Sequence, residues 1–207
     1  MKKMVLVLTL AAFALCGSAF AQDPAYQNNI GMYLTPAGHL DPTAEDGTGS
    51  CGVVGEDTPF TAYVVLSKLT NPEVWGWEAK IFPDNMLEIG FTIYGNFIDA
   101  GTRPNEHLVG LSDPLIVTDG AVVVAEAQYL VNSFYNDIGQ PSRAFIEGVY
   151  FSLIDPIQGP PAYLEAPGSN GVVLYNAFGD PFNPNDDFPA LIMNGDCLVV
   201  GVEDASF

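Results

Sequence analysis

Apolar and polar residues alternate along two segments of this chain in the pattern of half-buried β-strands. Within residues 74–82, Glu78 and Lys80 share one parity, and the opposite parity is apolar: Trp75, Trp77, Ala79 and Ile81. Residues 121–131 repeat the pattern, with Glu126 on the opposite side from small and aliphatic residues. Because successive side chains of a strand point to opposite faces, these segments are predicted to pack one face on a core.

Glycines and prolines divide the rest of the chain into further short apolar runs. No segment combines a helical period with capping residues. Many short strands separated by turn residues predict an all-β fold, an antiparallel β-sandwich of about nine strands of the immunoglobulin-like or jelly-roll kind. The strands are expected at residues 29–34, 60–68, 74–82, 87–94, 107–111, 121–131, 144–154, 172–175 and 197–202.

The N-terminal segment has the three parts of an export signal. Lys2 and Lys3 precede an apolar run at residues 4–15, and Ala19-Phe20-Ala21 fits the small-x-small cleavage rule. We therefore predict a cleaved signal peptide at residues 1–21 and a single β-sandwich domain at residues 22–207 that is secreted, periplasmic or on the cell surface. A lipid anchor on Cys16 is the alternative, although Leu15 stands where a lipobox has a small residue. No other run has transmembrane length, so no membrane insertion is expected after cleavage.

The chain is strongly acidic, with 25 acidic residues against 6 basic ones and a formal net charge of −19. Two of the six lie in the predicted signal, which leaves Lys68, Lys80, Arg103 and Arg143. Such a surface repels phosphate groups, which excludes nucleic acid and anionic membranes as partners. Acidity suits a solvated extracellular surface and also suits cation binding.

Cys51 and Cys197 are the two cysteines that remain after the predicted cleavage. In an oxidising compartment they allow one intramolecular disulfide, which would close nearly the whole domain and stabilise it by about 4.7 kcal/mol or more in the chain-entropy model. Two free thiols are the alternative. The glycines at 47, 49 and 52 form a G-x-G-x-x-G pattern, but a turn-rich loop precedes it and Pro59 follows, so a dinucleotide site is not expected.

Residues for catalysis are few. The chain has two histidines and no G-x-S-x-G motif, and Ser112-Asp113 lies near His107 only along the sequence. A zinc site would lack ligands if both cysteines are bridged. Glu126 and Glu147 interrupt apolar strands and are the acids to consider for glycoside hydrolysis, although outward orientation is the favoured interpretation. We therefore expect no enzyme, and a secreted glycoside hydrolase is the least favoured alternative.

Calcium is the one cofactor that the sequence suggests. The loop at residues 180–188 offers Asp180, Asn183, Asn185 and Asp187, whose oxygen atoms suit a hard cation. The loop is not an EF-hand, because Phe188 and Asn194 occupy the positions of the conserved glycine and glutamate of that motif. A looser calcium site and a solvated loop are both open, and the solvated loop is favoured.

Three runs of the sequence, residues 61–89, 116–131 and 193–203, carry a family resemblance. The order of a first strand, a Gly76-Trp77 strand and a Pro83-Asp84 turn resembles the cohesin-like and carbohydrate-binding-module-like sandwiches of secreted bacterial proteins. The resemblance covers most of residues 59–203 and implies a β-sandwich fold. No motif transfers that family's partner-binding residues to positions of this chain.

These observations together favour an exported, non-catalytic structural or interaction module at the cell surface, with an extracellular protein or a polysaccharide as partner. A carbohydrate-binding module, with calcium support, is the alternative. In that alternative Trp75 and Trp77 would form a sugar-stacking platform. Their shared parity with Ala79 and Ile81 favours packing in the core.

Overall fold

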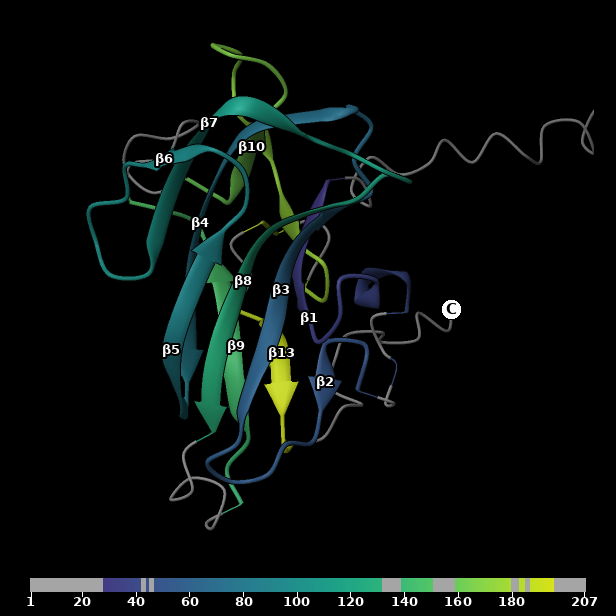
Figure 1. Ribbon diagram of the computed structural model, residues 1–207, viewed down its shortest axis with the longest axis vertical. Helices are drawn as coiled ribbons and strands as arrows, with labels where there is room; N and C mark the ends of the chain where they lie inside the picture. Colours follow the sequence, from purple (N-terminus) through teal and green to yellow (C-terminus); the bar gives the residue numbers. More distant parts are fainter. Residues whose placement is uncertain are drawn as a thin grey trace, which may run out of the picture.

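The computed structural model describes most of the chain as two β-sheets that pack face to face (Figure 1). The described residues are 28–41, 44, 47–131, 139–150, 159–179, 183–184 and 187–195. Among them, the only helical element is the 3₁₀ turn η2 (Gly38–Leu40). The predicted all-β sandwich is therefore confirmed. Within the same residues, no helix is long and apolar enough to cross a bilayer.

The first sheet has the strand order β12-β1-β3-β8-β5. All neighbours in it are antiparallel except β1 and β12, which run parallel. Its strands are β1 (Asn29–Tyr33), β3 (Pro59–Ser67), β5 (Met86–Ile93), β8 (Val122–Val131) and β12 (Tyr175–Asn176).

The second sheet follows the order β11-β10-β4-β9-β13-β2, and β7 pairs with both β4 and β6. Only β13 and β2 are parallel neighbours in this sheet. Its strands are β2 (Cys51–Gly52), β4 (Glu73–Asp84), β6 (Phe97–Asp99), β7 (Glu106–Ile116), β9 (Ser142–Glu147), β10 (Ala162–Leu164), β11 (Val172–Val173) and β13 (Pro189–Met193).

The main core lies between the two sheets and follows the predicted alternation. From β4 it takes Trp77, Ala79 and Ile81, and from β8 it takes Tyr129 and Val131, all fully buried. Alternating strand residues from both sheets meet there because each sheet can bury only one face against the other. Similar alternate residues of β1, β3, β9 and β13 complete the core.

A β-bulge in β4 changes which residues face the core. The register with β7 shifts between Val74 and Gly76, so Val74 is fully buried and Trp75 is only partly buried. The prediction that Trp75 shares the apolar face with Trp77 is therefore wrong, because the bulge inserts one residue and reverses the parity before it. Glu78 has the opposite parity to Trp77, as predicted, yet it is also fully buried.

A second, smaller core lies on the other side of the first sheet. Val65 stands between Val64 and Leu66, which face the main core, and therefore points the opposite way. Together with Tyr33 it packs against Phe178 and other residues from outside the sheet. One part of the outer face of this sheet is thus covered, whereas Leu87, Thr92 and Gln128 are exposed on the part formed by β3, β8 and β5. The full cluster is Tyr33, Cys51, Val65, Ala121, Phe178 and Ile192.

Most predicted strands are present with shifted ends. The strand predicted at residues 107–111 extends to Glu106–Ile116, and the strand predicted at residues 144–154 ends at Glu147. Four strands were not predicted: β2, β6, β10 and β13. The strand predicted at residues 197–202, like the signal peptide at 1–21, lies outside the described residues.

Gly76 and Gly110 form a cross-strand pair that tests the packing of β4 on β7. A methyl group at Gly76 would lie 2.6 Å from the carbonyl oxygen of Val109, whereas one at Gly110 would meet no atom within 4 Å. We expect Gly76→Ala to lower the free energy of unfolding by about 1–3 kcal/mol, because backbone must move. Gly110→Ala is the matched control and should stay within about 0.5 kcal/mol of wild type or stabilise. Urea unfolding measures both, and equal effects would contradict this packing.

Candidate functional site at the open edge of the sandwich

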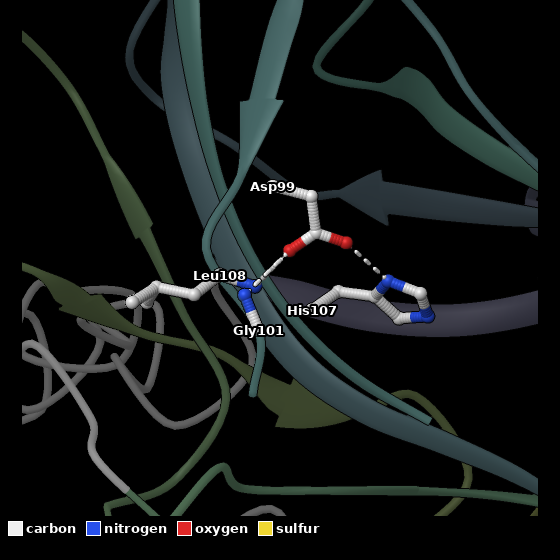
Figure 2. Close-up of polar contacts among 4 residues, drawn as sticks. All are labelled: Asp99, Gly101, His107 and Leu108. Carbon is white, nitrogen blue, oxygen red and sulfur yellow. Dashed lines mark hydrogen bonds and ion pairs between the residues drawn. The ribbon is translucent and has the colours of Figure 1, made fainter. Parts of the chain in front are cut away.

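Asp99 and His107 form a hydrogen-bonded pair where β6 meets β7. The Nδ1 atom of His107 lies 2.9 Å from Oδ2 of Asp99 (Figure 2). The other carboxylate oxygen, Oδ1, accepts hydrogen bonds from the backbone N–H groups of Gly101 and Leu108, each at 2.9 Å. The antiparallel pairing of β6 with β7 brings these residues together, and both oxygens of Asp99 are thereby satisfied.

These hydrogen bonds fix the charge of Asp99 and the tautomer of His107. Burial alone would raise the pKa of Asp99, but the N–H of Gly101, the ring of His107 and the N–H of Leu108 together hold it below its ordinary value. An ionised carboxylate can only accept hydrogen bonds, so Nδ1 of His107 carries the hydrogen. In the neutral imidazole, Nε2 is then an acceptor.

The ring of His107 joins the two sheets at the open edge of the sandwich. It stacks on Phe91 of β5, with ring centroids 4.2 Å apart and planes 8° from parallel. It also lies 5.8 Å from the ring of Trp77 on β4. Phe91 belongs to the edge strand of the first sheet, and His107 belongs to the second sheet. This stack therefore closes the gap between the two sheets.

Glu88 brings a second carboxylate to the same edge. It is the cross-strand partner of Tyr129, whose side chain is fully buried in the main core. Burial raises the pKa of Glu88, and the nearby His107 offsets part of that rise. Two acids and one imidazole are thus gathered at this edge from β5, β6 and β7.

Ser112, Asp113 and His107, which lie close together in the sequence, do not form a catalytic triad in the structure. His107 is bonded to Asp99, whereas the hydroxyl of Ser112 donates to Asp113 at 3.1 Å. A histidine–aspartate pair can move a proton, but acyl transfer also needs a nucleophile within hydrogen-bond reach of the histidine. Within the described residues, no three histidine, cysteine or acidic side chains are grouped closely enough to hold a metal ion.

Glu126 and Glu147, the acids considered for glycoside hydrolysis, are each bonded and lie on different sheets. Glu126 accepts a hydrogen bond from the hydroxyl of Tyr94 at 2.7 Å, and this bond raises the pKa of Tyr94 to about 12. Glu147 forms an ion pair with Lys80 at 2.9 Å. Both therefore point outward from the core, as expected, and each is partly buried and bonded to a partner.

The proposed sugar platform of Trp75 and Trp77 is not formed. Trp77 is fully buried in the core, so its ring offers no surface to a ligand. Trp75 is partly buried, and its Nε1 donates to Glu73 at 2.9 Å. Core packing, the favoured interpretation, therefore holds for Trp77 but not for Trp75, because the β4 bulge directs the two rings to different environments.

The structure describes part of the predicted calcium loop. Asn183 and Asp187 are exposed, whereas Asp180 and Asn185 lie outside the described residues. The calcium site stays a prediction.

The structure also describes one of the two paired cysteines that the sequence predicts. Cys51 is buried and disulfide-bonded, and Cys197 lies outside the described residues. Cys51 pairs in register with Ile192 of β13, which brings the chain leading to Cys197 alongside β2. The identity of the partner cysteine stays a prediction.

A weakly charged surface lies on the part of the outer face of the first sheet that β3, β8 and β5 form. Its residues are cross-strand neighbours on β3, β8 and β5, and we call them the β3–β8–β5 face. One row is apolar, a second is polar and uncharged, and the third holds a tyrosine and the bonded Glu126. The rows are Pro59–Leu130–Leu87, Thr61–Gln128–Gly90 and Tyr63–Glu126–Thr92.

A groove of about 700 Å³ lies on the outer side of β9 and β13. Phe145 and Phe188 supply aromatic lining, while Arg143 and Asp187 supply a donor and an acceptor. The sequence did not single out these four residues as a group, because they come from segments more than forty positions apart.

Comparison with solved structures finds similarity to cohesins. The sixth cohesin of scaffoldin B from Acetivibrio cellulolyticus, solved with a Cel5 dockerin mutant, is 13% identical, covering 82% of this chain and 99% of that chain at a TM-score of 0.43. The seventh ScaB type I cohesin from Pseudobacteroides cellulosolvens is 10% identical, covering 60% and 80% at a TM-score of 0.38. The likeness is one of fold. No family model and no curated protein matches the chain.

Replacing Asp99 tests the pair that orients His107. Asp99→Asn should lower the free energy of unfolding by about 1–2 kcal/mol at neutral pH, because a charge-assisted bond to the imidazole is lost. The pKa of Asp99 is lower in the folded state, so its contribution is present above the ordinary value of 3.8 and is lost as the pH falls through the folded value. The difference in free energy of unfolding between wild type and Asp99→Asn should therefore narrow as the pH falls below 3.8 and through the folded pKa of Asp99.

Asp113→Asn is the matched control, because Asp113 is an exposed acid whose carboxylate accepts from its neighbour Ser112. Urea unfolding at several pH values measures all three proteins. A difference in unfolding free energy between wild type and Asp99→Asn that stays constant down to strongly acidic pH would contradict the role of the Asp99 charge.

Proposed function

We propose that this chain is an exported, non-catalytic interaction module that binds an extracellular protein through the β3–β8–β5 face. The observation that carries the proposal is the composition of that face. Of its nine residues only Glu126 is charged, and its carboxylate already accepts a hydrogen bond from Tyr94. A partner covering this face would not have to desolvate an unpaired charge.

Exposed apolar side chains support binding at the same place. Leu87 is 58% exposed at one end of the apolar row, and the neighbouring bulge residue Ile89 is 47% exposed. Tyrosine is enriched among the residues that dominate binding energy at protein interfaces, and exposed aliphatic side chains add apolar area that a partner can bury. The face is also built on three paired strands, so its backbone needs little ordering when it binds.

The acidity of the chain favours a different protein as the partner over a second copy. Two copies with a formal charge of −19 each repel one another. A neutral or basic surface faces no such penalty. The N-terminal export pattern and the buried, disulfide-bonded Cys51 support an extracellular setting for that encounter.

A carbohydrate-binding role is the second candidate, and the groove beside β9 and β13 is the observation that favours it. A half-buried aromatic ring, Phe145, lies beside a guanidinium and a carboxylate there. Sugar rings stack on aromatic faces, and their hydroxyl groups need both donors and acceptors. In this candidate, calcium bound by the 180–187 loop would support the groove wall that contains Asp187.

Leu87→Asp tests the protein-binding proposal. The substitution places an unpaired charge on the apolar row and should weaken capture of the partner from native envelope material by about tenfold or more. Stability should change by less than about 0.5 kcal/mol, because the side chain is exposed. Quantitative pull-down measures protein binding, and a glycan array measures carbohydrate binding. Both are run with and without calcium.

Ile116→Asp is the matched control, since Ile116 is 63% exposed at the end of β7 on the other sheet. Equal capture by wild type and Leu87→Asp would contradict the use of this face. Glycan binding that Phe145→Ala abolishes and Leu87→Asp leaves intact would favour the second candidate.

The predicted disulfide gives a separate test of the extracellular setting. Peptide mapping of natively produced material without reductant should find Cys51 linked to Cys197. Reduction should then destabilise the domain by up to about 4.7 kcal/mol, since the crosslink closes a very long loop. A free Cys51 thiol, detected by alkylation of the unfolded and unreduced chain, would contradict the pairing.

A further inference from the structure

The carboxylate of Glu88 stands out at the open edge because it lacks a partner. Both oxygens of Asp99 are satisfied, whereas Glu88 makes no hydrogen bond or ion pair with the described residues. Its side chain is about half buried, which raises its pKa. A partly desolvated carboxylate without donors costs free energy.

A buried polar atom on the strand beside it also lacks a partner. The hydroxyl of Tyr129, the cross-strand neighbour of Glu88, is buried without a hydrogen-bond partner. Native structures leave few such atoms unsatisfied, and a water or a ligand group is one of the ways in which such an atom is satisfied.

The positive charges nearest in the sequence and the sheet are engaged elsewhere. Lys80 forms its ion pair with Glu147 on the outer face of the second sheet. Arg103, in the turn between β6 and β7, lies 3.6 Å from the ring centre of Tyr150. With His107 neutral, the cluster therefore holds two carboxylates and no cation.

We propose that Glu88, His107 and Tyr129 form a binding site for a primary ammonium group, such as the side chain of a lysine on a partner protein, with Asp99 orienting the imidazole. Such a group has three N–H donors. The cluster offers three acceptors without partners: the carboxylate of Glu88, Nε2 of His107 and the hydroxyl oxygen of Tyr129. Asp99 holds the imidazole so that Nε2 is the acceptor, and the rings of Phe91 and Trp77 provide aromatic faces beside the charge.

This site is independent of the proposed function. Glu88 and Phe91 point toward the second sheet, whereas Leu87 and the β3–β8–β5 face point away from it. The site can therefore exist whether or not that face binds a partner, and the two are tested by different residues.

The test is an NMR titration of the full chain with Nα-acetyl-lysine N-methylamide as the probe, following the ring resonances of His107. We expect saturable shifts with this probe and none with the neutral norleucine analogue.

Glu88→Gln should weaken binding of the probe by about tenfold, because the charged carboxylate acceptor is replaced by a neutral amide. The variant should still fold, since a neutral side chain removes the burial penalty of the carboxylate. Glu126→Gln is the control and should bind the probe like wild type. Equal shifts with the norleucine analogue, or wild-type binding by Glu88→Gln, would each overturn the proposal.

Discussion

Burying one face of each sheet against the other is the constraint on which the rest of this structure depends. It places Trp77, Ile81 and Tyr129 in one core and thereby directs the neighbouring residue of each strand outward. It also leaves an open edge where β5 of one sheet faces β7 of the other. The stacked rings of Phe91 and His107 fill that gap, so the chemistry at the edge follows from the packing.

The long strands were predictable because their alternation is an intrinsic property of the sequence. Both β4 and β8 are at least ten residues long and carry clear periods. Strands of two or three residues, such as β2 and β10, carry no period, and their neighbours in the sheet define them. The β-bulges were equally hard to predict from the sequence. Val74 and Trp75 are adjacent apolar residues, so the alternation does not decide which of them is buried, and only the register with β7 shows that Trp75 has left the core face.

The candidate site was less predictable than the fold, because it depends on which face a strand turns inward. Along β5 the apolar Leu87 and Ile89 favour one inward parity, yet they are exposed and Glu88 points inward. The bulge at Ile89 then returns Phe91 to the core. Similarly, Asp99 meets His107 only because a three-residue strand, β6, folds back on β7. The turn residues Gly101 and Pro104 indicate a reversal, but not its register.

Partly buried carboxylates in this chain accept hydrogen bonds mostly from neutral donors, because lysine and arginine are scarce. Backbone N–H groups hold Asp99 and the hydroxyl of Tyr94 holds Glu126, whereas Glu147 uses one of the few lysines. Glu88 departs from this pattern. An inward charge next to a bulge is also a known means of keeping an edge strand from pairing with another sheet. That protection needs only a charge at this position, whereas ammonium binding also needs the oriented imidazole, and the Asp99–His107 bond has no part in protecting the edge.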